Sequence, residues 1–264
     1  MSGMEGLRVL HCCSTTNSDS VYAQRLREEG CMVTSLPVIK VQYFDEEHVP
    51  LFLMTEKMAK SDWVIFSSIH GINAFYRLKE IHAAFNRQRG RLKVGLVGKK
   101  AWHAFKLYFS HWPEPVRAGH INRLLEEIAG HNPDERQKVL HLTSRESLAL
   151  LRIYPPDRIE LERLPLYRMV GVELSGEARE MLERESYDLL FFNSPSTFYF
   201  FREGAFAEKH LRGTAIAVLG ERSRNYMEGQ GYPVAVVPAI PTPDAFVEAV
   251  YRSMDNIRHY KGKA

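Results

Sequence analysis

The sequence predicts an α/β protein made of two similar domains, each built on a parallel β-sheet. Short apolar runs alternate with stretches of helical periodicity along most of the 264 residues. Several blocks of the first half also return in the same order in the second half. Alternating strands and helices are typical of parallel sheets joined by right-handed crossovers. At roughly 150 residues per domain, the length fits two domains or one large one.

The internal repeat is the observation on which the two-domain prediction depends. Val9-Leu10-His11 returns as Val139-Leu140-His141, 130 positions later, and the spacing between later pairs of blocks falls gradually to 122. An ancient duplication followed by small loop deletions explains this drift. The other paired blocks are DWVIFSS at 62–68 with DLLFFNS at 188–194, KVGLVG at 93–98 with TAIAVLG at 214–220, and HINRLLEEI at 120–128 with TPDAFVEAV at 242–250.

Each apolar run of about five residues predicts a strand that is buried on both faces, because it lacks the alternation of a half-exposed strand. A polar or glycine break follows each run, and a helical stretch follows the break. The predicted helix faces are Ala23, Leu26 and Arg27, then Ala101, Phe105 and Tyr108, and finally Ala245, Val247, Ala249 and Val250.

Two segments, 32–44 and 159–172, differ from the other predicted strands. They are longer, partly alternating, and each contains an internal proline that a central strand tolerates poorly. Their matching places in the two copies favour strands that connect the domains, at about 36–44 and 160–172. Residues 1–38 with 172–264 then form one domain and residues 40–166 the other. Two consecutive domains are the alternative.

Composition excludes several classes of function. The net charge of +3 and the absence of long like-charge runs give little support for nucleic-acid binding. No apolar run approaches the roughly 18 residues of a membrane span, and residues 1–7 lack the basic and apolar regions of a signal peptide. Three cysteines, two of them adjacent, form neither a disulfide framework nor a zinc pattern. We therefore expect a cytoplasmic protein without a metal site.

Candidate binding residues follow the predicted strands, where open α/β sheets bind their ligands. Hydroxyls, glycines and lysine or arginine side chains stand at these helix starts and suit an anion. Ordinary helix capping is the alternative for the serines. No glycine-rich nucleotide fingerprint is found. The candidates are Ser68, His70, Gly98, Lys99, Lys100, Arg145, Ser194, Ser196, Gly220, Arg222 and Ser223.

Tyrosine, histidine and cysteine positions require a separate interpretation. Tyr167 lies in the second connector, where its phenol could donate a proton, although an interface tyrosine is the alternative. His11 and His141 lie within apolar strands and are expected to be satisfied core or strand-end groups. The thiols of Cys12-Cys13 end a strand and are expected to be buried rather than nucleophilic.

The blocks resemble the uroporphyrinogen-III synthase family over nearly the whole chain. The resemblance rests on DWVIFSSIHGINAF, KVGLVGKKAW, LPLYRMV, DLLFFNSPSTFYFF, AIAVLGERS and PTPDAFVEAV, in that order. It implies two Rossmann or flavodoxin-like parallel-sheet domains joined by a two-stranded connector, with a cleft between them. It also implies a monomeric lyase that needs no cofactor and works in tetrapyrrole biosynthesis. Such an enzyme cyclises hydroxymethylbilane to uroporphyrinogen III, with inversion of ring D and loss of water.

The resemblance also implies roles for particular residues. Ser68, Ser194, Ser196 and Ser223 would bind substrate carboxylates, and Tyr167 would help the ring A hydroxyl leave as water. The chain departs from the family's usual residues at Ala101 and Cys12-Cys13, where threonine and a Thr-Arg-Pro type turn are common. A non-catalytic binding or regulatory module on the same scaffold is therefore an alternative. A two-domain transferase or sugar-binding protein is another.

Overall fold

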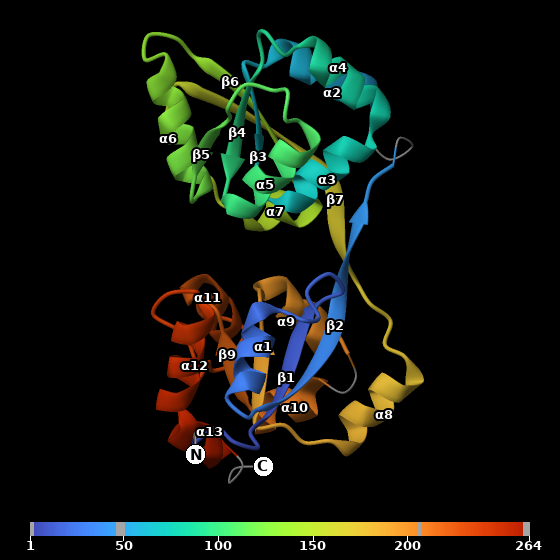
Figure 1. Cartoon of the computed structure of the whole chain (residues 1–264), viewed down its shortest axis with the longest axis vertical. Helices are drawn as coiled ribbons and strands as arrows, with labels where there is room; N and C mark the ends of the chain where they lie inside the picture. Colours follow the sequence, from blue (N-terminus) through green and yellow to red (C-terminus); the bar gives the residue numbers. More distant parts are fainter. Residues whose placement is uncertain (1–2, 46–50, 205–206, 261–264) are drawn as a thin grey trace. The chain divides into compact units, whose positions relative to one another are not determined.

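The computed structural model describes residues 3–45, 51–204 and 207–260 (Figure 1). The chain divides into two compact units. Unit 1 contains Met1–Lys40 and Val170–Ala264, and unit 2 contains Val41–Met169. Two long strands, β2 (Met32–Tyr43) and β7 (Ile159–Gly171), run across the boundaries between these ranges. The cleft expected between the two domains stays a prediction.

Unit 1 is a parallel sheet covered by helices on both faces. Its strand order is β2-β1-β8-β9, where β1 is Arg8–Ser14, β8 is Leu189–Phe192 and β9 is Ala215–Val218. Side chains from α1, α12 and α13 join Val9, Phe191 and Ala217 in one apolar cluster, and Phe198 and Phe201 of α9 pack against Phe192 on the other face. The helices are α1 (Val21–Glu28), α8 (Gly176–Arg184), α9 (Pro195–Arg202), α10 (Ala207–Gly213), α11 (Glu221–Glu228), α12 (Pro243–Arg252) and α13 (Met254–Tyr260).

Unit 2 repeats this layered plan. Its strand order is β5-β4-β3-β6-β7, with β3 at Trp63–Phe66, β4 at Lys93–Val97, β5 at Val116–Ala118 and β6 at Gln137–Ser144. Neighbouring pairs from β5 to β7 are all parallel. The helices are α2 (Leu51–Lys60), α3 (Ile69–Arg77), α4 (Lys79–Arg87), α5 (Lys99–Tyr108), α6 (Ile121–His131) and α7 (Arg145–Leu150).

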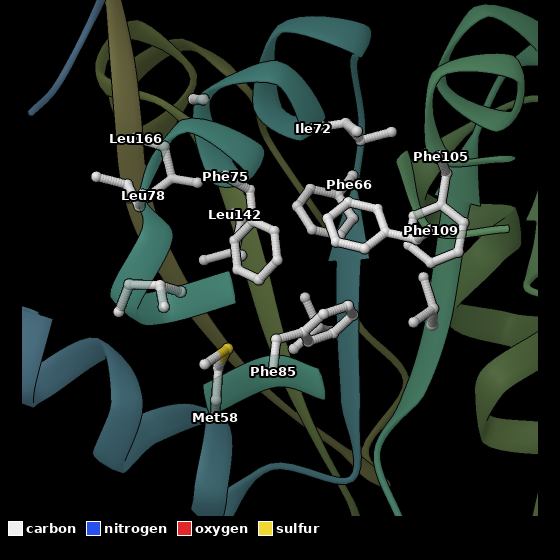
Figure 2. Packing of buried hydrophobic residues seen from close by; sticks show 14 of the residues in the cluster. Met58, Phe66, Ile72, Phe75, Leu78, Phe85, Phe105, Phe109, Leu142 and Leu166 are labelled. Atoms are coloured by element: carbon white, nitrogen blue, oxygen red, sulfur yellow. The ribbon is translucent and has the colours of Figure 1, made fainter. Parts of the chain in front are cut away.

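Aromatic side chains fill the larger core of unit 2. Phe75 of α3 and Phe85 of α4 meet edge to face, with ring centroids 4.9 Å apart, and Phe109 packs against both (Figure 2). Full burial of one such side chain stabilises a fold by roughly 1.5–3 kcal/mol. A second cluster, on the face covered by α6, contains Trp63 and Ile65 of β3 with residues of that helix.

The predicted α/β class with parallel sheets is confirmed. All four residues of β3, of β8 and of β9 are buried, as the short apolar runs predicted. Two details of the helix prediction are wrong. In α1 the Arg27 side chain is 41% exposed instead of continuing the buried face of Ala23 and Leu26. In α12 the structure buries Phe246 with Val247 and Val250 and packs Ala249 partly buried against the same cluster, whereas Ala245 is partly exposed. The large ring of Phe246 occupies the core against Phe191 instead.

The two prolines mark equivalent irregularities in the long strands. Pro37 of β2 lies opposite Cys13, and Pro165 of β7 lies opposite Thr143. Immediately after each proline the register shifts by one residue. A bulge of this kind suits proline, which has no N–H to donate to the ladder. In unit 2 the shift places Tyr167 opposite Ser144.

Candidate functional site

Serines cap the helices that follow β3 and β8. The Oγ atom of Ser68 accepts the Gly71 N–H at 3.1 Å at the start of α3. Ser194 begins α9 with a capping box, in which its Oγ accepts the Thr197 N–H at 3.3 Å. Helix capping, the alternative given for these serines, therefore applies to both. For Ser68 it is not the whole role, because its hydroxyl has a second partner.

That partner is the phenol of Tyr167. The Tyr167 oxygen lies 2.7 Å from Ser68 Oγ, and the side chain is only 6% exposed. Burial is the main cause that raises the pKa of Tyr167, although hydrogen bonding by Ser68 and Ser144 acts against it. The phenol therefore stays protonated at neutral pH. When the Ser68 hydroxyl donates to Tyr167, the phenol keeps its own proton to give to a ligand.

His70 and Tyr43 extend this cluster. The Tyr43 hydroxyl lies 3.4 Å from Nδ1 of His70, and the rings of both residues lie near Tyr167, with the Tyr43 centroid 6.5 Å and the His70 centroid 5.9 Å away. Burial, and secondly the charge of Lys100, lower the pKa of His70, so its imidazole is neutral at pH 7. The Arg77 guanidinium lies over the Tyr43 ring, 4.4 Å from its centroid.

Sequence reasoning missed Tyr43 and Arg77. Tyr43 lies in the first connector, as Tyr167 lies in the second, so the same signal could have identified it. Arg77 stands in the last turn of α3, where a basic residue needs no explanation beyond the helix dipole. Its position over Tyr43 depends on tertiary packing, which the local sequence does not reveal.

Three predicted cations lie at the carboxyl-terminal ends of β4 and β6, the strands on either side of β3. Lys99 and Lys100 begin α5 after Gly98, and Arg145 begins α7, where its guanidinium lies 5.2 Å from the Phe44 ring. All three side chains are exposed. Within residues 3–45, 51–204 and 207–260, none of them has a carboxylate partner, so their charge is available to an anion. Because β4, β3 and β6 are parallel neighbours, these cations lie along the carboxyl-terminal ends of the strands, as Ser68 and His70 do.

The predicted residues of unit 1 gather at two neighbouring strand ends. Ser194 and Ser196 follow β8, and Gly220, Arg222 and Ser223 follow β9, which is paired in parallel with β8. Ser196 is partly buried, Arg222 is exposed and Ser223 is buried. Among the residues described in this unit, Arg222 has no ion-pair partner. Unit 1 therefore places a second, smaller set of the predicted hydroxyl and cationic groups at neighbouring strand ends.

The structure also answers the predictions for the cysteines and for membrane spans. Cys12, Cys13 and Cys31 are free and buried, and burial raises the pKa of the Cys13 thiol to about 11. Such a thiol is protonated and a poor nucleophile, as expected for Cys12-Cys13. Across the described ranges, every helix is too short or too polar to cross a bilayer.

Fold and site together define the class of protein. Each unit is a parallel α/β sheet whose carboxyl-terminal strand ends carry hydroxyls and exposed cations, in an α/β class that binds ligands at these strand ends. A sequence model of the family described as uroporphyrinogen-III synthase HemD matches residues 20–248. The chain belongs to that family, whose enzymes function in haem biosynthesis.

Individual relatives agree with this assignment. The "Porphyrin biosynthesis protein HemD" of Ruminiclostridium josui is 24% identical over 185 residues, which are 68% of this chain and 36% of the relative. The chain thus spans about a third of the length of that curated relative. A mutant uroporphyrinogen III synthase from the extremely thermophilic bacterium Thermus thermophilus has a TM-score of 0.56 at 16% identity, covering 95% of this chain and 100% of its own. The Helicobacter pylori uroporphyrinogen-III synthetase has a TM-score of 0.58 at 14% identity, with coverages of 92% and 97%. These two likenesses show the shared fold.

Proposed function

We propose that the chain is a uroporphyrinogen-III synthase, a lyase that closes hydroxymethylbilane into uroporphyrinogen III with inversion of ring D. The observation that carries the proposal is the buried Tyr167 phenol, 2.7 Å from Ser68 Oγ at the end of β3. A protonated donor held at a strand end beside exposed cations suits a reaction in which a polyanion loses a hydroxyl group.

The charges of the site match those of the proposed substrate. Hydroxymethylbilane carries eight carboxylates, and unit 2 offers Lys99, Lys100 and Arg145 without carboxylate partners among its described residues. Helix amide groups at the starts of α3 and α5 add further donors for an anion. In unit 1, Arg222 and the serines after β8 and β9 are proposed to bind carboxylates of the bilane as well.

The proposed chemical step is acid-assisted loss of water. Tyr167 gives its phenolic proton to the ring A hydroxyl as the C–O bond breaks, and the oxygen leaves as water. The ring A methylene carbon then bonds to the substituted carbon of ring D. The bond from that carbon to the bridge from ring C breaks, and the bridge carbon bonds instead to the unsubstituted carbon of ring D, whose released proton restores the phenol. General acid help of this kind contributes typically 10²–10⁴-fold. The binding groups hold the bilane in the geometry that gives the inverted isomer.

Several finer features belong to the same proposal. The step uses only proton transfer and positioning, so we propose that the enzyme needs no metal or organic cofactor. We also propose a monomer that acts on this small molecule in the cytoplasm, without a nucleic-acid or membrane partner. The small net charge of +3 gives little support for a nucleic-acid partner, and the free cysteines fit a reducing compartment such as the cytoplasm.

The test is an assay with hydroxymethylbilane made in situ by a deaminase, followed by oxidation and separation of the porphyrin isomers. We expect the type III isomer to exceed the spontaneous background, in which the bilane closes to type I. Type I alone, at the uncatalysed rate, would refute the proposal. If the protein bound the bilane and left its closure unchanged, the non-catalytic binding module would be the correct alternative.

A further inference from the structure

Two histidines occupy equivalent buried positions in the two units. His11 lies in β1 and His141 in β6, each at the end of its Val-Leu-His repeat, and both are fully buried. The mechanism proposed above uses neither of them. A buried imidazole is costly unless its ring nitrogens find partners, so a repeated one points to a specific contact. The expectation of a satisfied ring is wrong in part for His141, because its buried Nδ1 has no hydrogen-bond partner among the described residues.

The contact is the same in both units. Nε2 of His141 lies 2.8 Å from Ser67 Oγ, and Nε2 of His11 lies 3.1 Å from Asn193 Oδ1. His141 is paired with Ile65 in the sheet, and His11 with Phe191. Ser67 and Asn193 follow those partners by two residues and therefore lie on the same side of the sheet as them. Each histidine thus reaches across to the first polar residue beyond the neighbouring strand.

The orientation of the His11 ring follows from its partners. Asn193 Oδ1 can only accept a hydrogen bond, so Nε2 of His11 carries the proton. Nδ1 is then the acceptor, and the Ser35 hydroxyl, 3.3 Å away, donates to it. Burial keeps the ring neutral by lowering the pKa of His11 to about 4. A neutral ring with one fixed tautomer is a rigid support for the turn that it contacts.

The residues that the histidines hold stand directly before the helix caps. Ser67 precedes Ser68, which caps α3 and contacts the Tyr167 hydroxyl. Asn193 precedes Ser194, which caps α9. A displacement at Ser67 would be passed through one peptide unit to the Ser68–Tyr167 contact, because the cap and the strand end share that backbone.

We propose that His141 and His11 are positioning residues, which fix Ser67 and Asn193 and thereby the strand-end turns that present Ser68 and Ser194. In unit 2 the hydrogen bond between His141 and Ser67 sets the Ser68–Tyr167 pair. The catalytic consequence of this inference rests on the proposed function, whereas its structural part does not.

The test compares three substitutions at His141. His141→Leu removes the hydrogen bond. His141→Gln places an amide nitrogen near the position of Nε2, within reach of Ser67 Oγ. His141→Asn places its amide nitrogen near the position of Nδ1, and this shorter side chain cannot reach Ser67 Oγ. The first readout is the 13Cζ resonance of Tyr167 at pH 7, assigned from the Tyr167→Phe spectrum, because this shift reports the hydrogen bond of the phenol.

We expect the Tyr167 resonance to move in the Leu and Asn variants and to return to the wild-type position in the Gln variant. His11→Leu, a change in unit 1, should leave the resonance unmoved. In the isomer assay we expect kcat to fall about tenfold or more in the Leu and Asn variants, with KM changed less than about threefold, since positioning errors act on the transition state. The Gln variant should recover most of the loss.

An unmoved Tyr167 resonance in the Leu variant, or equal behaviour of the Gln and Asn variants, would overturn the inference. If the Leu variant does not fold, the comparison of Gln with Asn still decides it. A wild-type protein without synthase activity would refute the proposed function, and the resonance shift would still test the positioning role.

Discussion

The residue that carries the proposed chemistry is Tyr167, and its behaviour depends on one neighbour. Burial alone would keep the phenol protonated, but it would not aim the phenol. The 2.7 Å contact with Ser68 supplies the direction, because a hydroxyl that caps a helix is fixed by the helix. Tyr167 and Ser68 therefore act as a unit, and their effects on rate should not be additive.

Tyr167→Phe removes the phenolic proton while keeping the ring. We expect the rate of type III formation to fall roughly 10²–10⁴-fold, as for loss of a general acid. Steady-state kinetics with isomer analysis measures the loss. Tyr154→Phe in the same unit is the matched control, because Tyr154 is 69% exposed and its side chain makes none of the contacts of the site. A Tyr167→Phe enzyme as fast as the control would remove Tyr167 from the mechanism.

Most individual site residues could be predicted from the sequence because they follow a recognisable strand end, and Tyr167 because it lies in a connector. Ser68 and Ser194 follow obvious apolar runs, and both begin helices as expected. The role of Ser67 could not be inferred in this way, since its partner His141 is 74 positions away. Contacts across a sheet depend on register, and the local sequence does not specify register between distant strands.

At the scale of elements, the buried strands were predictable and their irregularities were not. Continuous apolar runs identified β3, β8 and β9 because a strand buried on both faces has no polar face to show. The prolines of β2 and β7 correctly indicated unusual strands. That each proline lies beside a one-residue register shift depends on pairing with β1 and β6, which the sequence does not fix.

Two glycines begin equivalent helices with different backbones. Gly98 precedes α5 with φ 82° and ψ 158°, a conformation nearly confined to glycine, while Gly220 precedes α11 with φ 177°. An added Cβ would meet no heavy atom within 4 Å at either position. An alanine would therefore be strained at position 98 and unstrained at position 220, with room for its Cβ at both.

We expect Gly98→Ala to lower the free energy of unfolding by about 1–3 kcal/mol, because alanine must adopt a strained conformation there. Gly220→Ala, the matched control, should change it by less than about 0.5 kcal/mol, since an extended backbone suits any residue. Urea denaturation followed by circular dichroism measures both. Equal effects of the two substitutions would show that the backbone at Gly98 is not strained.

At the scale of the whole molecule, the duplication gives both units a buried histidine with an equivalent contact. A buried histidine in each unit contacts a strand-end polar group of its own unit. The repeated Val-Leu-His blocks predicted an equivalence of position, and the structure adds an equivalence of contact. Acid protonates imidazoles, so a decrease in pH should lower the stability of both units through these histidines.

Burial lowers the pKa of His11 to about 4 and that of His141 to about 3, against 6.5 for an exposed imidazole. Below pH 6.5 the unfolded chain binds protons at these sites and the folded protein does not. The free energy of unfolding therefore falls as pH decreases, from about 6.5 until the folded-state pKa of each group is passed. Between pH 7 and pH 5 each histidine should cost roughly 2 kcal/mol of stability.

Replacing both histidines with glutamine isolates this effect, because glutamine keeps a hydrogen-bonding amide and does not titrate. We expect the loss of stability between pH 7 and pH 5, measured by urea denaturation, to be smaller in the double variant by about 4 kcal/mol. The single variants should each remove about half of that difference, since the two groups lie in separate units. If wild type and double variant lost the same stability over this range, the imidazoles would not be buried as neutral groups. Other histidines whose pKa is lowered by burial, such as His70 and His210, would then have to account for any acid sensitivity that remained.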